Sequence, residues 1–114
     1  MQQDADVPPS MRLVVSFKLA RALEKMHNYN EASDQYYTNV VMAYVDGVRA
    51  GVLFDGNARS LFARAAFVLA DECEASGNRR QAERMLRYVV DAKIPSSDAA
   101  RERISRLRKE SGRK

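Results

Sequence analysis

Few side chains of the types that commonly do chemistry occur in this sequence, which has one histidine, His27, and one cysteine, Cys73. A histidine can serve as a general base and a cysteine as a nucleophile or redox sensor, but both roles need an activating neighbour. His27 stands beside Asn28 where a turn is expected, and Cys73 falls on an apolar stripe. We therefore expect an exposed turn residue and a small buried core residue. The chain is predicted not to be an enzyme.

Metal and cofactor sites are not predicted either. Asp71, Glu72 and Glu74 form an acidic cluster, but no loop makes their carboxylates converge on an ion. The cluster is interpreted as a solvated face or as part of a ligand groove. A single cysteine excludes a disulfide framework and a multi-cysteine zinc site. The glycines are isolated and none precedes a Lys-Ser or Lys-Thr pair, so no phosphate-binding loop is present.

The excess of positive charge lies at the C-terminal end. Residues 1–98 carry a formal charge of −1 and residues 99–114 carry +5. Two interpretations stay open for this segment: a solvated capping helix, or a surface for nucleic acid, an acidic partner or an anionic membrane. No aromatic residue is interleaved for stacking on bases. The helical part of this basic surface consists of Arg101, Arg103, Arg106, Arg108 and Lys109.

Length and composition indicate what kind of domain carries these residues. The 114 residues, 46% hydrophobic and 30% charged, suit one globular domain. No run of about 18 apolar residues predicts a transmembrane helix. The opening MQQDADVPPS has no apolar region of the kind found in signal peptides. Localisation stays open between the cytoplasm and, if a signal was trimmed, the bacterial cell envelope.

Apolar residues at three- and four-residue spacing predict five helices separated by proline and glycine. They begin near Pro9, after Asn28, near Asn57, near Arg80 and near Ser97. The segment 44–56 is ambiguous: we favour a helix to about Ala50 followed by a loop, with a hairpin turning at Asp46-Gly47 as the alternative. The expected inward residues are Leu13, Phe17, Ala20, Leu23, Met26, Ala32, Tyr36, Val40, Tyr44, Leu61, Ala65, Leu69, Cys73, Ala82, Leu86, Val89, Val90, Ala100, Ile104 and Leu107.

An internal repeat appears when the chain is shifted by 50 residues. Residues 10–40 and 60–90 then share eight of 31 positions. The shared residues include Ala20 with Ala70 and Ala32 with Ala82, which lie where two helices of a hairpin would pack closely. The other identical pairs are Ser10/Ser60, Phe17/Phe67, Leu19/Leu69, Glu24/Glu74, Asn28/Asn78 and Val40/Val90.

This pattern resembles the tetratricopeptide repeat family, in which a Leu-Gly pair, a Gly-Asp/Asn-Tyr turn and a Glu-Ala pair mark one hairpin. The first copy reads Leu19-Ala20, His27-Asn28-Tyr29 and Glu31-Ala32. The second copy reads Leu69-Ala70, Gly77-Asn78-Arg79 and Gln81-Ala82. His27 stands where the family prefers glycine, Asn39 where it prefers a small apolar residue, and the 50-residue offset exceeds the family's usual 34.

The resemblance implies an all-α fold of about five antiparallel helices, with two hairpins and a C-terminal capping helix in an α-solenoid fragment. We expect an extended arm at 1–8, hairpins at about 10–50 and 57–92, a capping helix at about 97–110 and a basic tail at 111–114. The implied function is a protein–protein interaction scaffold for a peptide or protein partner. A homodimer is also compatible with the sequence.

By resemblance, the first helix of each hairpin would line a peptide-binding face. The implied positions are Phe17, Arg21, Glu24 and Lys25 in one copy, and Arg64, Phe67, Asp71 and Glu74 in the other.

For the tyrosines and for one apolar triplet, the sequence leaves two interpretations open. Tyr29, Tyr36, Tyr37 and Tyr44 would pack between hairpins or face a partner. The triplet Val52-Leu53-Phe54 would enter the core or dock on a second chain.

Overall fold

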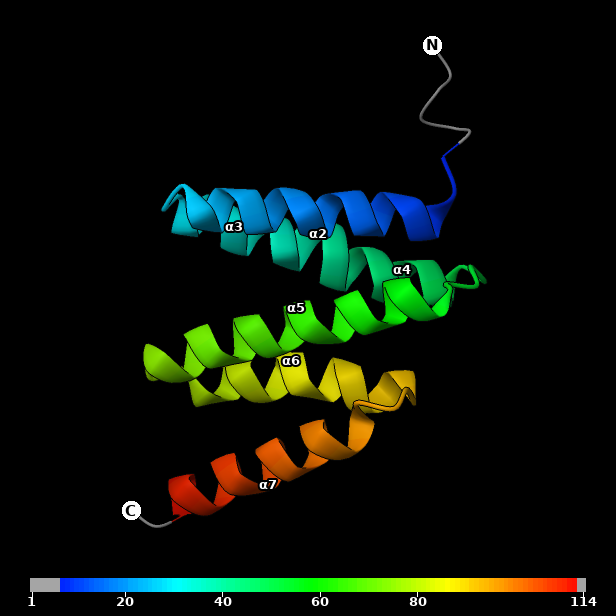
Figure 1. The fold of residues 1–114 in the computed structure, drawn as a ribbon. Helices are drawn as coiled ribbons and strands as arrows, with labels where there is room; N and C mark the ends of the chain where they lie inside the picture. Colours follow the sequence, from blue (N-terminus) through cyan, green and yellow to red (C-terminus); the bar gives the residue numbers. More distant parts are fainter. Residues whose placement is uncertain (1–6, 113–114) are drawn as a thin grey trace. The chain divides into compact units, whose positions relative to one another are not determined.

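The computed structural model describes residues 7–112, and these residues form five helices without a strand (Figure 1). The first is α2 (Pro9–Lys25). The second is continuous through α3 (Tyr29–Tyr36), the π-helical η1 (Tyr37–Val41) and α4 (Met42–Arg49). Then follow α5 (Gly56–Ala75), α6 (Arg79–Ala92) and α7 (Ser97–Gly112). The all-α class and the number of helices agree with the sequence prediction.

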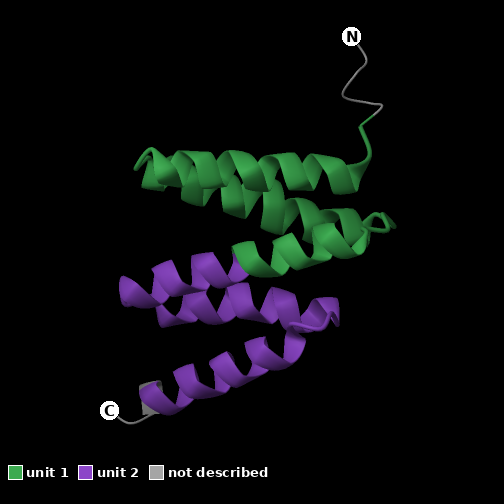
Figure 2. Ribbon diagram, viewed as in Figure 1, with its two compact units in different colours: residues 1–65 green, residues 66–114 purple. Residues whose placement is uncertain are grey.

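The chain divides into two compact units, one up to Ala65 and one from Ala66, so that the division falls inside α5 (Figure 2). In the first unit, α2 and α3 form an antiparallel hairpin. Ala20 and Ala32 are fully buried in it, as expected for small residues at a close helix contact. The ring of Phe17 meets the buried ring of Tyr36 edge-on, with centroids 5.5 Å apart.

The π-helical turn in the middle of the second helix was not predicted. A π turn holds about one residue more than an α turn, so it shifts the register of the apolar row along the helix. Val40 and Val41 are both fully buried here. The stripe then continues to Tyr44, whose ring stacks on Phe62 at a centroid distance of 4.1 Å.

Segment 44–56 is helix followed by loop, as favoured, and the hairpin alternative is wrong. The helix ends at Arg49, and residues 52–55 have no regular structure. Asp55 then caps α5, because its Oδ1 accepts a hydrogen bond from the Ala58 amide at 2.8 Å. Phe54 lies against the helix so closely that a β-carbon on Gly47 would stand 2.8 Å from two ring atoms. Glycine is therefore the residue that this approach admits.

The second unit consists of the end of α5 with α6 and α7. Its core contains Ala70, Ala82, Met85, Leu86, Val89, Ala100, Ile104 and Leu107. The connection from α6 to α7 is pinned by Ser97. Its buried Oγ accepts from the Ile94 amide at 3.1 Å and donates to the Val89 carbonyl at 3.0 Å. The capping helix thus packs on α6 through its predicted apolar positions.

The turns at 25–29 and 75–79 have the same geometry, as the 50-residue repeat implies. His27 has φ +63° and Gly77 φ +82°. The amides of Asn28 and Asn78 bond to the carbonyls of Leu23 and Cys73, at 2.9 and 2.8 Å. These are the bonds of a Schellman motif, in which a residue in left-handed conformation ends the helix. His27 therefore adopts the conformation for which the second copy uses glycine.

Some predicted core positions are wrong. Met26 is exposed because the helix has ended there and the chain is turning. Cys73 is half-buried instead of buried, and Leu23, Leu61 and Val90 are likewise half-buried. Leu23, Leu61 and Val90 lie at the edges of their apolar stripes, and Cys73 lies in the last turn of α5, where the helix is about to end.

The predicted N-terminal arm and basic tail lie partly outside the described residues. The expected N-terminal arm falls outside the described residues for positions 1–6, and the expected basic tail does so for positions 113–114. Within the described part, none of the helices is long and apolar enough to cross a membrane.

Candidate functional site

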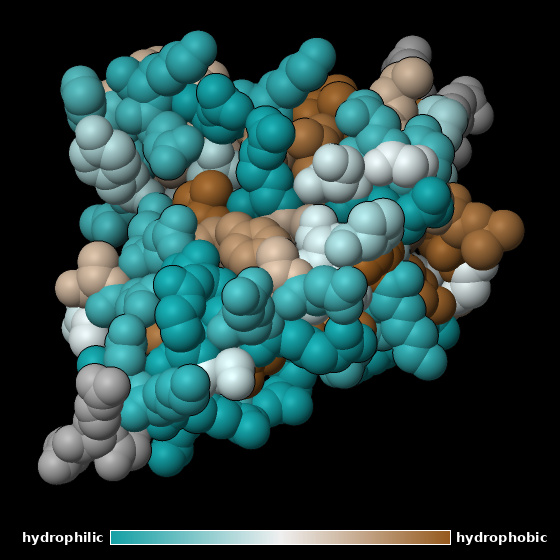
Figure 3. Space-filling view, turned by 60° about the horizontal axis from the view of Figure 1, so that its bottom comes forward, coloured by the Kyte–Doolittle hydropathy of each residue, from teal (hydrophilic) through white to brown (hydrophobic). Residues whose placement is uncertain are grey.

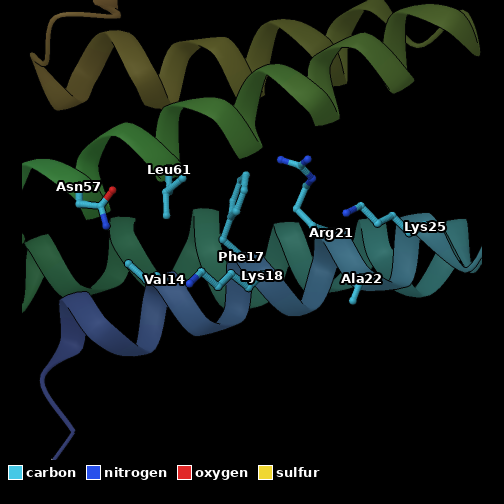
Figure 4. Close-up of a pocket in the computed structure, with 8 residues that line it drawn as sticks. All are labelled: Val14, Phe17, Lys18, Arg21, Ala22, Lys25, Asn57 and Leu61. Atoms are coloured by element: carbon cyan, nitrogen blue, oxygen red, sulfur yellow. The ribbon is translucent and has the colours of Figure 1, made fainter.

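A cleft of about 500 Å³ lies within the first unit, between α2 and the first half of α5. Figure 4 shows Phe17 and Leu61 pointing toward each other from these two helices. Val14, Phe17 and Leu61 supply its apolar surface, and Lys18, Arg21 and Lys25 supply its cations.

Helix geometry explains why α2 brings these groups together. Phe17, Arg21 and Lys25 follow one another at intervals of four, and Val14, Lys18 and Arg21 follow at intervals of three or four. Residues at these spacings share one side of a helix. Phe17 is held in place by its contact with Tyr36, so the floor of the cleft is set by the core of the unit.

The cleft is electropositive. Among the described residues, no carboxylate lies within ion-pair distance of Lys18, Arg21 or Lys25. The single acid of α2 is Glu24, and its Oε1 accepts a hydrogen bond from the buried Tyr36 hydroxyl at 2.8 Å. Three cations are thus left to attract negative charge from outside.

Of the four site residues predicted in the first copy, the structure brings three together here, and Glu24 instead serves the hairpin. Sequence reasoning assigned Leu61 only to the core, and it missed four other lining residues: Val14, Lys18, Ala22 and Asn57. The signal for Val14 and Lys18 was present, since both lie three or four residues from a predicted position on the same helix. For Leu61 the signal was absent, because Phe17, which it faces, lies 44 residues earlier in the sequence.

The predicted residues of the second copy do not line this cleft. Arg64 is exposed on α5 and Phe67 is half-buried. Asp71 and Glu74 accept hydrogen bonds from Arg103 of α7 at 2.5 and 2.9 Å. The hydrogen bond to Asp71 is the main cause that raises the pKa of Arg103 above its usual value. Asp71 and Glu74, which the resemblance places in a peptide-binding groove, are thus bonded to α7 within their own unit.

Much of the basic surface on α7 is paired with acids of its own unit. Besides Arg103, Arg108 donates to Glu83 at 2.7 Å and Arg101 to Asp98 at 2.8 Å. Arg106 and Lys109 are exposed, and no carboxylate of the described residues pairs with them. Figure 3 shows a face on which hydrophilic residues predominate, with apolar residues in small areas between them.

The surroundings of His27 and Cys73, the two residues considered for catalysis, are as follows. His27 is exposed in its turn, with Nδ1 2.7 Å from the hydroxyl of Tyr29. Burial, and then the charge of Glu72, raise the pKa of the Cys73 thiol, which lowers its reactivity. Among the described residues, no group of three or more His, Cys, Asp or Glu side chains could hold a metal ion.

The tyrosines and the loop triplet, for which two interpretations were open, differ in burial from residue to residue. Tyr36 and Tyr44 are buried in the first unit, Tyr37 is half-buried and Tyr29 is exposed. In the loop triplet, Phe54 enters the core against Tyr44, while Leu53 is 94% exposed. The triplet therefore neither enters the core nor stays outside as a whole.

Comparisons with models of protein families, with curated proteins and with solved structures found no match to this chain.

Proposed function

We propose that this protein is a non-enzymatic interaction module, similar to tetratricopeptide repeat domains, that binds a peptide or protein partner along α2. The observation that carries the proposal is the cleft beside Phe17, where an apolar floor lies next to three cations without an acidic partner among the described residues. The matching Schellman turns and the buried alanines of the two hairpins support the likeness to helical repeats.

The composition of the cleft defines what would fit it. An apolar side chain of the partner would contact Phe17 and Leu61, and carboxylates on either side of it would face Arg21 and Lys25. A cleft of about 500 Å³ accommodates a short segment of a few residues. The predicted partner segment is therefore acidic with one large apolar residue.

The test measures binding of short fluorescent peptides that contain one leucine or phenylalanine among glutamates, by fluorescence anisotropy. Arg21→Glu should weaken binding by about tenfold or more, because it removes one favourable charge and adds a repulsive one. The matched control is Arg84→Glu, an exposed arginine of α6 that does not line the cleft. Peptides with lysine in place of glutamate should bind no better than background.

Two results would contradict the proposal. One is equal weakening by Arg21→Glu and Arg84→Glu, which would indicate a non-specific charge effect. The other is undiminished binding to a cleft whose apolar floor has been changed by Leu61→Ser, provided that circular dichroism shows an intact fold. Leu61 is half-buried, so this substitution should be tolerated better than one at the buried Phe17.

Nucleic-acid binding through α7 is the alternative, and it has less support because Arg101, Arg103 and Arg108 are engaged with carboxylates. Deleting residues 99–114 would not test it cleanly, since Ile104 and Leu107 belong to the core. Reversing Arg106 and Lys109 to glutamate is the cleaner test. Salt-dependent binding to a DNA duplex that this double variant loses would favour the alternative.

A further inference from the structure

A second surface on α2 faces away from the core of the unit and is apolar. Met11, Val15, Leu19 and Met26 are between 49% and 61% exposed, and Ala22 between them is also exposed. Their spacings of four, four, three and four residues place them in one row along the helix, and we call this row the α2 seam. The buried residues Leu13, Phe17 and Ala20 occupy the opposite side.

In the other copy of the repeat, the same side of the helix is largely covered. The 50-residue shift aligns Met11, Val15 and Leu19 with Leu61, Ala65 and Leu69. In the second copy Ala65 and Leu69 are buried and Leu61 is half-buried. The same side of the repeat is thus covered in one copy and open in the other.

The exposed side of α7 differs from that of α2. From Arg101 to Glu110, the exposed positions of α7 are all charged residues or serine. In helical stacks the terminal elements present a polar outer face to water. α7 satisfies this condition and α2 does not, so α2 is suited to contact with another helix.

Charge selects the kind of helix that would cover the seam. Lys18, Arg21 and Lys25 of α2 have no carboxylate within ion-pair distance among the described residues, and the helix carries one acid, Glu24. Lys18 and Lys25 lie at the border between the seam and the cleft. A second copy of α2 would bring like charges together, which opposes pairing. An apolar row bordered by cations instead complements an amphipathic helix with acidic flanks.

We propose that the α2 seam binds an acidic amphipathic helix of a protein partner. This surface shares Ala22 with the cleft, but its centre is formed by Val15 and Leu19, which do not line that cavity. Either surface can therefore fail without the other. Such a helix would bury its apolar residues against the seam and place its carboxylates near Lys18 and Lys25.

The probe is a fluorescein-labelled helical peptide of about 17 residues, the length of α2, with leucines in one row and glutamates beside them. A scrambled peptide of the same composition, in which the leucines share no side, is the peptide control. The amphipathic peptide should bind at least about tenfold more tightly than the scrambled one. Binding should weaken when NaCl rises from about 50 mM to about 500 mM, because exposed charges are then screened.

Val15→Ser and Leu19→Ser should each weaken binding by about tenfold. Because the two side chains are 59% and 49% exposed, the fold should be kept. Leu53→Ser is the matched control, since it removes an exposed leucine outside the seam and should leave binding unchanged. Arg21→Glu and Leu61→Ser report on the cleft. If they abolish peptide binding while the seam variants do not, the cleft is the binding surface and the seam is not.

Three other results would overturn the proposal. One is equal binding of the amphipathic and scrambled peptides. Another is dimerisation at micromolar concentration that Leu19→Ser abolishes, measured by sedimentation velocity, which would assign the seam to a second copy. The third is a marked gain in peptide affinity on deletion of residues 1–6, which would assign the seam to the chain's own first residues.

Discussion

Replacing His27 by glycine and by alanine measures what the left-handed backbone at the end of α2 costs. His27 and Gly77 occupy the same place in two turns with matching hydrogen bonds, and their φ angles are +63° and +82°. A side chain other than glycine is strained in this region because its β-carbon crowds the following carbonyl. His27→Gly should remove that strain, and Gly77→Ala should create it in the other copy.

The size of the effect follows from the two turns. Left-handed backbone costs about 1–2 kcal/mol for a residue with a β-carbon. Glycine offsets about 0.5–1 kcal/mol of this gain, because its backbone loses more freedom on folding. A β-carbon on Gly77 meets no atom within 4 Å, so no clash adds to the strain. His27→Gly should therefore be more stable than His27→Ala by about 0.5–1 kcal/mol, and Gly77→Ala should lose about the same amount.

His27→Ala is the proper reference because it also removes the contact between the His27 ring and the Tyr29 hydroxyl. The measurement is urea unfolding followed by far-UV circular dichroism, with the slope of free energy against urea compared among variants. Equal stability of His27→Gly and His27→Ala would refute the assigned strain. A loss at Gly77→Ala without a matching gain at position 27 would refute the equivalence of the two turns.

Three further substitutions test the packing and electrostatics. Gly47→Ala should destabilise the fold by about 1 kcal/mol in urea unfolding, because displacing the Phe54 ring costs about 1–3 kcal/mol and better helix propensity returns about 1. Hydrogen bonds from Arg108 and Arg87 lower the pKa of Glu83 below 4.5, so its stabilising effect is present at neutral pH and is lost as the pH falls through the lowered value. The difference in Tm between wild type and Glu83→Gln should accordingly shrink from about pH 7 to about pH 3, and a constant difference would contradict the ion pair's role. The raised pKa of Cys73 predicts slower reaction with a thiol reagent at about pH 7.5 in the native than in the urea-unfolded protein, and Cys73→Ser serves as the blank.

The periodicity of the sequence predicted the helices well because it depends on local spacing. Proline, glycine and the apolar rows locate each end within a few residues, including the end of α4 at Arg49. The π turn at Tyr37–Val41 could not be predicted in this way. Extending the row from Tyr36 to Tyr44 in steps of four assumes a regular helix, and only tertiary packing reveals that Val40 and Val41 are both buried.

The candidate site was predicted in part for the same reason. Phe17, Arg21 and Lys25 lie on one helix, so their common direction follows from the sequence alone. The fate of Asp71 and Glu74 could not be foreseen, because Arg103, which binds both, comes about 30 residues later on another helix. The spacing of residues predicts which side of a helix they share, but it does not predict which other helix packs against that side.

The division between the two units has a practical consequence for anyone who wishes to express one without the other. It falls between Ala65 and Ala66, in the middle of the continuous helix α5. A chain that stopped there would end in a helix whose last four carbonyls have lost their intrahelical donors. A fragment meant to carry the first unit should therefore extend through Gly77 and Asn78, where the chain supplies its own helix stop.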